Sequence, residues 1–194
     1  MTSYEDQLIQ QSKDGDLDAF NQLVESYQRP IYNLTLRMLG NPQDAEDASQ
    51  EAFVLAWKAI RSFKGGSFRT WFFRIASNAC TDHLRRRRGR QTDSLDALFP
   101  EHNPLPSSTE SPEDHLLREE LSQLISQHLL CLAEEQRLVV TLADLQGFSY
   151  EEIAQITNSS LGTVKSRLNR GRSNLRDLLL KNRELLPPEF RLYK

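Results

Sequence analysis

Residues 147–172, GFSYEEIAQITNSSLGTVKSRLNRGR, have the pattern of two short helices separated by a tight turn. Ser149 stands three residues before Glu152, which is capping-box spacing, so the first helix is expected to begin at Tyr150. Ser160 follows a turn of asparagine and serine and is a suitable N-cap for the second helix. The stretch therefore predicts a helix-turn-helix, a motif whose second helix fits the major groove of DNA.

The second helix has an apolar stripe and an opposite polar face. The stripe consists of Leu161, Val164, Leu168, Leu175 and Leu178. On and beside the polar face are the residues that we predict to bind duplex DNA: Ser160, Thr163, Lys165, Ser166, Arg167, Asn169 and Arg170. Such side chains hydrogen-bond base edges and neutralise phosphates. A basic surface helix without a partner is the alternative, but capping box, turn and polar face together favour DNA binding.

Charge is segregated along the chain although the totals nearly balance. The sequence has 24 lysines and arginines against 27 aspartates and glutamates, so the chain as a whole does not attract nucleic acid. Basic residues gather at 85–90 and 165–183, and acids gather at 44–51 and 93–114. Two basic segments in an acidic background predict contact with an anion in two places.

The segment 42–60 is expected to form a helix that begins with acids. Asp44, Glu46 and Asp47 stand near the positive end of its dipole, which favours carboxylates. Charge pattern alone therefore favours a solvated helix start over a binding site. A helix is also expected over 16–39, where Pro30 should kink or split it.

A glycine loop and a long helix follow, at 63–68 and 69–90. Gly65 and Gly66 let the loop backbone approach a partner closely. The predicted exposed face of the helix consists of Arg74, Ser77, Asn78, Thr81, Arg85 and Arg88, with Trp71 at its border. An aromatic side chain among arginines and amides is typical of single-stranded nucleic-acid binding, where stacking and phosphate contacts combine.

The second half of the chain also reads as helical. Residues 91–112 are rich in proline, serine and acids, which indicates an extended linker. Helices are expected from Pro112, with a leucine stripe, and over 134–146. We predict an all-α protein of two small helical domains joined by a flexible linker, with domains at 1–92 and 113–183, the linker at 93–112 and a tail of unknown role at 184–194.

No metal, cofactor or disulfide is expected. Cys80-x-x-His83 and His128-x-x-Cys131 each place two possible ligands one helical turn apart, but they fall in different predicted domains and no further ligand supports a split zinc site. The two cysteines suit a reducing cytoplasm. A polar N-terminus without a long apolar stretch predicts a soluble cytoplasmic protein with no membrane insertion.

Four blocks of the sequence resemble, in order, the signatures of bacterial sigma factors of the sigma-70 family, in the short form of the extracytoplasmic-function group. They are DAEDASQEAFVLAW (44–57), FRTWFFRIASNACTDHLRR (68–86), GFSYEEIA (147–154) and GTVKSRLNRGR (162–172). Two departures are visible: Cys131-Leu132-Ala133 stands where the family often has Leu-Pro, and Gly171 stands where alanine is common. Gly171 should cost the helix about 1 kcal/mol relative to alanine.

The resemblance implies a factor without a catalytic site that binds core RNA polymerase, directs it to promoter DNA and helps to open the duplex. It assigns polymerase binding, at the β′ clamp, to Asp44, Glu46, Asp47, Gln50 and Glu51, which replaces the solvated interpretation of those acids. It also implies contact of the C-terminal domain with the β flap, a linker in the RNA path, a monomer and an anti-sigma factor as a further partner.

The resemblance also divides the promoter between the two predicted nucleic-acid surfaces. The helix-turn-helix would read the upstream (−35) element as duplex. The loop and the long helix would bind the melted strand of the −10 element, and the loop would border a pocket for an extruded base. The residues assigned to the melted strand are Lys64, Gly65, Gly66, Ser67, Trp71, Arg74, Asn78, Arg85 and Arg88.

Two other functions remain alternatives at this point. A conventional helix-turn-helix regulator with an N-terminal sensor or dimerisation domain would bind a palindrome as a dimer, but it leaves residues 44–57 and the arginine-rich helix unexplained. An enzyme acting on nucleic acid would need metal-binding carboxylates or a positioned nucleophile and base. The acids stand at helix starts and in the linker, and the histidines are scattered at 83, 102, 115 and 128.

Overall fold

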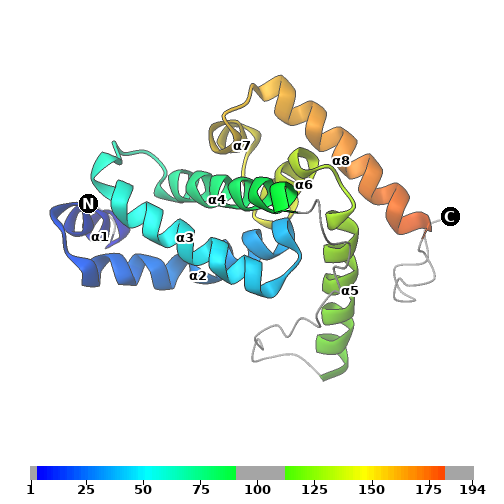
Figure 1. The fold of residues 1–194 in the computed structure, drawn as a ribbon, viewed down its shortest axis with the longest axis horizontal. Coiled ribbons are helices and arrows are strands. Elements are labelled where there is room, and N and C mark those ends of the chain that lie inside the picture. Colours follow the sequence, from blue (N-terminus) through cyan, green and yellow to red (C-terminus); the bar gives the residue numbers. More distant parts are fainter. Residues whose placement is uncertain (1–3, 91–111, 182–194) are drawn as a thin grey trace.

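The computed structural model describes residues 4–90 and 112–181, and every regular element within these ranges is helical, as predicted (Figure 1). In chain order they are α1 (Tyr4–Asp14), α2 (Leu17–Leu39), α3 (Pro42–Ala59), the 3-10 turn η1 (Ile60–Ser62), α4 (Phe68–Arg90), α5 (Pro112–Leu130), α6 (Glu134–Val140), the π-helical turn η2 (Thr141–Leu145), α7 (Tyr150–Thr157) and α8 (Leu161–Lys181). The predicted linker, apart from Pro112, and the predicted tail at 184–194 lie outside the described residues.

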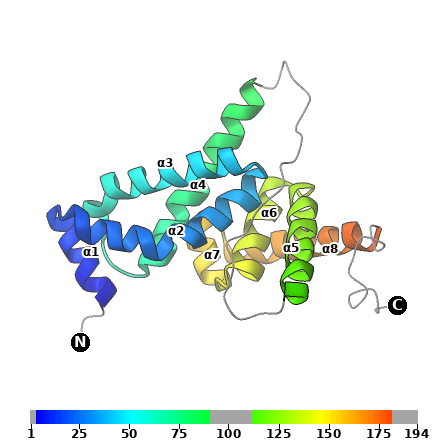
Figure 2. The same cartoon turned by 90° about the horizontal axis from the view of Figure 1, so that it is seen from below.

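The N-terminal half, α1 to α4, is built around the contacts of α2, α3 and α4 (Figure 2). On α3 the face toward the core carries Ala45, Ala48, Ala52 and Ala56, all fully buried. These small side chains repeat at helical spacing, so the backbone of α3 can approach its neighbours closely. Phe72 of α4 is also fully buried in this core.

The N-terminal half departs from the sequence predictions in two places. Pro30 does not split the helix expected over 16–39, because α2 continues through it to Leu39. The helix α1 was not predicted at all, since its buried apolar residues, Leu8 and Ile9, are too few to show a periodicity. Tertiary contact holds α1 in place instead: Tyr27 of α2 donates a hydrogen bond to Glu5 at 2.7 Å.

The helix-turn-helix of the C-terminal half, α5 to α8, forms as the sequence predicts. The Ser149 amide donates to Glu152 at 2.8 Å, and the Glu152 amide donates to the Ser149 hydroxyl at 3.2 Å, which completes the capping box. Asn158 ends α7 in the left-handed region, at φ 48°. Ser160 then caps α8, accepting from the Thr163 amide at 3.1 Å.

Two further expectations for the C-terminal half need correction. The helix expected over 134–146 is α-helical only to Val140 and continues as η2. Gly171 is more than a weak helix former, because α8 crosses α6 there: a Cβ atom at Gly171 would lie 2.8 Å from Cγ2 of Val140 and 3.3 Å from the Gln136 carbonyl oxygen. The glycine therefore permits the close contact of α6 and α8.

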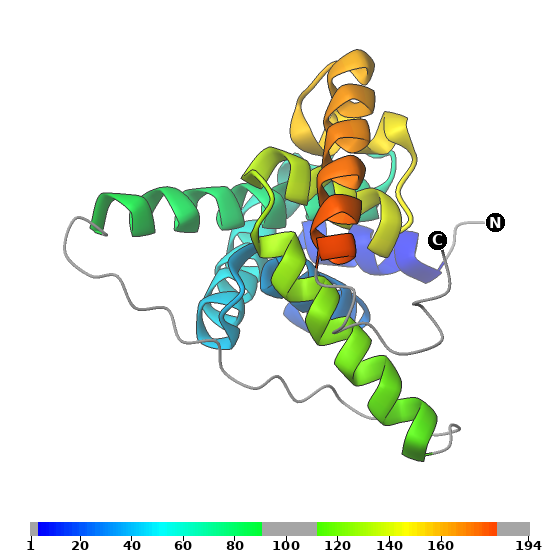
Figure 3. The ribbon, with the colours of Figure 1, turned by 90° about the vertical axis from the view of Figure 1, so that its right-hand side faces the viewer.

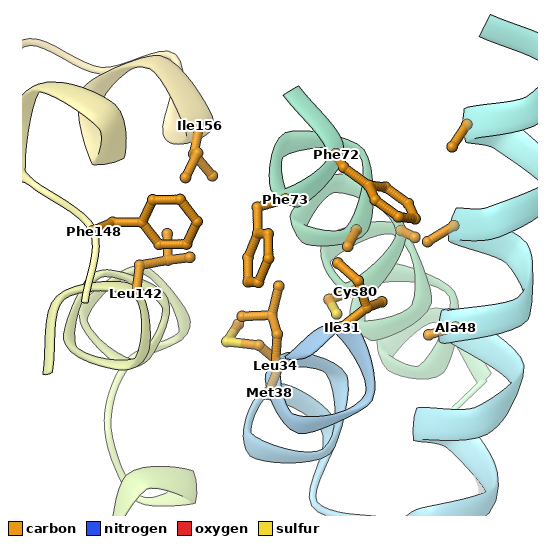
Figure 4. Close-up of a cluster of buried hydrophobic side chains, with 14 of the residues drawn as sticks. Ile31, Leu34, Met38, Ala48, Phe72, Phe73, Cys80, Leu142, Phe148 and Ile156 are labelled. Atoms are coloured by element: carbon orange, nitrogen blue, oxygen red, sulfur yellow. The ribbon is translucent and has the colours of Figure 1, made fainter. Parts of the chain in front are cut away.

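The two halves pack directly against each other, which the sequence did not predict. Figure 4 shows Phe73 of α4, with Leu34 and Met38 of α2, facing Phe148 and Leu142 across the boundary. The rings of Phe73 and Phe148 are 4.7 Å apart between centroids, and Phe73 is fully buried. One continuous hydrophobic core thus joins the halves.

Candidate nucleic-acid and polymerase interfaces

The polar face of α8 is accessible for most of its length. Lys165, Ser166, Asn169 and Arg170 are exposed, as a surface that reads duplex DNA requires. With the start of α6 this face lines a hollow of about 490 Å³.

Three of the predicted duplex-binding residues, Ser160, Thr163 and Arg167, have partners within the protein. Thr163 shares a hydrogen bond of 2.8 Å with the Ser160 hydroxyl, at the N-cap. Arg167 forms an ion pair of 2.7 Å with Glu135 and donates to the Ser159 hydroxyl at 3.0 Å. Arg167 must therefore exchange a carboxylate for phosphate or a base edge if it is to bind DNA.

The predicted strand-binding face of α4 is exposed at Arg74, Asn78 and Arg85. The C-terminal end of α4 projects from the body of the molecule (Figures 2 and 3). Arg88, near that end, forms an ion pair of 2.8 Å with Glu134. Ser77 was placed on this face wrongly: it is 2% exposed, because the tight packing around α4 buries a wider strip than its apolar residues define.

A cavity of about 400 Å³ lies between the glycine loop and the first turns of α4. Its wall includes the loop residues predicted to border a pocket, Lys64, Gly65, Gly66 and Ser67, together with two residues predicted to bind the melted strand, Trp71 and Arg74. Gly65 and Gly66 have φ values of 98° and 89°, a backbone conformation that side chains disfavour. Contact with the rings of Phe63 and Phe68, both 5.3 Å away between centroids, fixes the indole of Trp71. The cavity thus brings together an aromatic ring, a cationic side chain and a hydroxyl, groups that can stack on a base and hydrogen-bond to it.

The acids of α3 divide into two groups. Asp44 lies 3.2 Å from Nε2 of His83 and 3.7 Å from Arg87, and Glu51 forms an ion pair of 2.9 Å with Arg86. These contacts hold α4 against α3.

The outward-facing members of the predicted polymerase-binding set are Glu46, Asp47 and Gln50, which are exposed. Sequence reasoning missed Val54 and Leu55, which are 51% and 40% exposed on the same helix. Exposed apolar side chains beside acids are typical of a protein-binding surface. Helical periodicity could have predicted their exposure, since both residues fall outside the stripe of alanines that faces the core.

The cysteines and histidines that were considered as a split zinc site lie in separate environments in the structure. Cys80 is fully buried in the core of the N-terminal half (Figure 4), whereas Cys131 is exposed. The Nδ1 atom of His128 lies 2.7 Å from the Leu124 carbonyl oxygen. In the described ranges, no three histidine, cysteine or acidic side chains gather as metal ligands would. Among the helices at 4–90 and 112–181, none combines the length and the apolar character of a membrane span.

Comparison with known proteins identifies this arrangement. Residues 23–90 match the family model described as Sigma-70 region 2, and residues 122–175 match Sigma-70, region 4. The chain belongs to the extracytoplasmic-function (ECF) group of the sigma-70 family. It is an RNA polymerase sigma factor that directs transcription initiation.

Several relatives cover most of the chain. RNA polymerase sigma-H factor of Pseudomonas aeruginosa is 40% identical over 171 residues, which span 86% of this chain and 89% of that protein. ECF RNA polymerase sigma factor SigW of Bacillus subtilis is 39% identical over 176 residues, covering 88% and 94%. ECF RNA polymerase sigma-E factor of Escherichia coli is 38% identical over 170 residues, covering 85% and 88%.

Two similar solved structures are complexes. CnrH bound to the cytosolic domain of CnrY has a TM-score of 0.63 and 28% identity, covering 89% of this chain and 94% of CnrH. The sigma factor RpoE bound to the anti-sigma factor NepR, from Bartonella quintana, has a TM-score of 0.68 and 27% identity, covering 84% and 98%.

Family membership decides between the functions that the sequence left open. Sigma factors are not enzymes and bind core RNA polymerase, so an enzyme acting on nucleic acid is excluded. The conventional regulator is excluded as well, because the match to region 2 accounts for the N-terminal half that it left unexplained.

Proposed function

We propose that three surfaces of this sigma factor divide the work of initiation. The polar face of α8 reads the −35 element as duplex DNA, the cavity and the exposed face of α4 bind the melted −10 strand, and the outer face of α3 binds the polymerase clamp. The observation that carries this division is the position of α3. It lies on the side of α2 and α4 away from the C-terminal half (Figure 4), so polymerase can reach it without displacing α8.

The DNA-binding roles rest on exposed hydrogen-bonding groups with complementary charge. Lys165 and Arg170 would supply phosphate neutralisation, and Ser166 and Asn169 would reach base edges. At the −10 element, Trp71 would stack on the extruded base. Arg74 lines the same cavity and would hold the strand by its phosphates.

The polymerase-binding role combines charge and apolar area. Glu46, Asp47 and Gln50 would form the polar rim, and Val54 and Leu55 would form the apolar centre. Asp44 and Glu51 would act mainly through their ion pairs with α4. The C-terminal half would contact the β flap.

An anti-sigma factor is a further partner in this proposal. Support comes from the two similar structures, both solved as complexes, one of them with a protein described as an anti-sigma factor. The protein would work in the cytoplasm, where polymerase is found, and would bind polymerase as a monomer.

Charge reversal on α3 separates polymerase binding from DNA reading. Glu46→Arg with Asp47→Arg should weaken binding to purified core polymerase about tenfold. The two substitutions replace negative charges by positive ones, which would be repelled by a polymerase surface that is complementary to the carboxylates. Glu25→Arg, an exposed acid on α2, is the matched control and should bind normally. Binding is measured by fluorescence anisotropy of labelled protein. Equal affinity of the α3 variant and the control would remove the polymerase role from α3.

Arg170→Ala tests the proposed reading of the −35 element by α8. This variant should bind core normally and should lose the difference in run-off transcription between templates with and without the −35 element. Loss of core binding in Arg170→Ala would show that α8 does not have a separate role.

A further inference from the structure

One cation on the DNA-reading face of α8 is held by a carboxylate from a different helix. Nη2 of Arg167 lies 2.7 Å from a carboxylate oxygen of Glu135, in the first turn of α6, and Nη1 donates to the Ser159 hydroxyl at 3.0 Å. Lys165 and Arg170, the other cations predicted to bind duplex DNA, form no ion pair within the described residues. Arg167 is thus the member of this set that must break an ion pair before it binds DNA.

The carboxylate of Glu135 lies at the surface where the duplex would bind. Its side chain is 70% exposed, whereas that of Arg167 is 26% exposed. Glu135 lines the same hollow as Ser166 and Arg170, two residues proposed to contact the −35 element. A negative charge in this position would repel the phosphate backbone of any duplex, whatever its sequence. The carboxylate therefore opposes DNA binding both by repelling phosphate and by occupying a cation.

The strengths of the competing contacts decide which duplexes can displace the carboxylate. An exposed ion pair of this kind favours its bound state by at most about fivefold. A phosphate offers Arg167 another charged oxygen in place of the carboxylate, so that exchange brings little gain. A bidentate contact to O6 and N7 of guanine discriminates against other bases by about five- to hundredfold. A base pair that presents such paired acceptors can therefore draw Arg167 away from Glu135, whereas the backbone alone does not.

We propose that Glu135 is a specificity-determining residue for the −35 element: it keeps Arg167 from binding the backbone of unrelated duplex and releases it to the paired acceptors of the correct element. This inference rests on the proposed reading of the −35 element by α8. Glu135 acts through Arg167, and it sets the difference between two affinities rather than adding to either. Loss of the carboxylate should therefore tighten binding to duplex DNA and at the same time reduce discrimination.

Glu135→Gln tests the first of these effects, because it removes the charge and keeps the size of the side chain. The affinity of the full chain for a labelled duplex of random sequence is measured by fluorescence anisotropy over a range of salt concentrations. The freed Arg167 should neutralise one more phosphate. Binding at low salt should then tighten by about three- to fivefold, and the slope of log affinity against log salt should steepen by about 0.9.

The matched control is Glu151→Gln. Glu151 is an exposed acid in the first turn of α7, within the same helix-turn-helix, and it takes part in no ion pair in the part of the chain that the structure describes. This substitution should leave the salt slope unchanged, because it frees no cation. A wild-type slope in Glu135→Gln, or an equal change in the control, would overturn the inference.

A double-mutant cycle separates action through Arg167 from a structural role of Glu135. In an Arg167→Ala background, Glu135→Gln should no longer steepen the slope, because the cation that it frees is missing. A structural role in α6 would instead weaken binding to every duplex, in either background. A steeper slope with Arg167 already removed would show that the carboxylate acts on phosphate alone, and would refute the proposed pairing.

Discrimination itself is measured with holoenzyme. Run-off transcription is compared on one promoter recovered from genomic fragments, with its upstream element intact or scrambled. The wild type should prefer the intact template, and Glu135→Gln should lose about three- to fivefold of that preference. Full preference in Glu135→Gln would overturn the inference. Arg170→Ala distinguishes the two possible failures: if it too retains the full preference, α8 does not read the −35 element and the proposed function fails as well.

Discussion

Substitution of Gly171 by alanine sets two physical effects of opposite sign against each other. In an isolated helix the change should stabilise by about 1 kcal/mol, because alanine restricts the unfolded chain and favours the helix. In this fold the new methyl group would lie 2.8 Å from Cγ2 of Val140 and 3.3 Å from the Gln136 carbonyl oxygen. Carbon atoms pack at about 3.5–4.0 Å, so α6 and α8 must move apart.

The balance favours destabilisation. Overpacking of a tight contact costs about 1–3 kcal/mol, which at its lower end offsets the gain in helix propensity and otherwise exceeds it. We therefore expect the free energy of unfolding to fall by about 0–2 kcal/mol in Gly171→Ala, which is the overpacking cost less the propensity gain of about 1 kcal/mol. The measurement is urea unfolding of the full chain followed by far-UV circular dichroism.

Two further variants isolate the cause. Gly162 is exposed in the same helix, and the atom nearest to its added Cβ is the Ser160 hydroxyl oxygen at an ordinary 3.8 Å. Gly162→Ala should therefore stabilise, by about 0.5 kcal/mol. Val140→Ala removes one clashing atom, so Gly171→Ala should cost less in that background. If Gly171→Ala stabilises by about 1 kcal/mol, as propensity alone predicts, the steric argument is wrong.

Three other predictions follow from the described contacts. Glu152→Ala should destabilise the helix-turn-helix by about 1 kcal/mol at pH 7, measured by urea unfolding. The Ser149 amide lowers the pKa of Glu152, so this contribution is present above about pH 4.3 and is lost as the pH falls through the lower folded-state pKa; a difference that persists at pH 2 would contradict it. Native protein should react with one equivalent of a thiol reagent, at Cys131, because burial raises the pKa of Cys80 to about 12, and Cys131→Ser should abolish that reaction. Free protein should bind promoter duplex weakly in a gel-shift assay, and nanomolar specific binding would refute this.

Local signals predicted the helix-turn-helix well because they act over a few residues. The capping box at Ser149 and the N-cap at Ser160 each satisfy backbone groups within one turn of helix, so sequence spacing alone reveals them. The glycine loop likewise has the positive φ values that its residues suggest. The polar faces of α4 and α8 could be outlined because each is defined by the periodicity of one helix, whereas the role of the acids on α3 was implied only by the family resemblance.

Features that depend on contacts between distant segments were not predictable in this way. Ser77 is buried although its position suggested exposure, and Gly171 is required by a neighbour 31–35 residues earlier in the chain, at 136–140. The meeting of Phe73 with Phe148 is the largest such case. Nothing in the local sequence around either phenylalanine specifies the other. The packing of α7 against α4 could therefore be seen only in the structure.

The proposal that separate surfaces of this sigma factor perform separate steps of initiation is tested most directly by run-off transcription. The assay uses purified core polymerase, with and without this protein, on a library of genomic fragments. The account predicts sequence-selective transcripts that appear only with the protein and share an upstream and a start-proximal element. It also predicts that Arg170→Ala changes use of the upstream element, whereas Trp71→Ala changes strand opening at the start-proximal one. Transcripts that arise equally without the protein, or that respond identically to both substitutions, would contradict it.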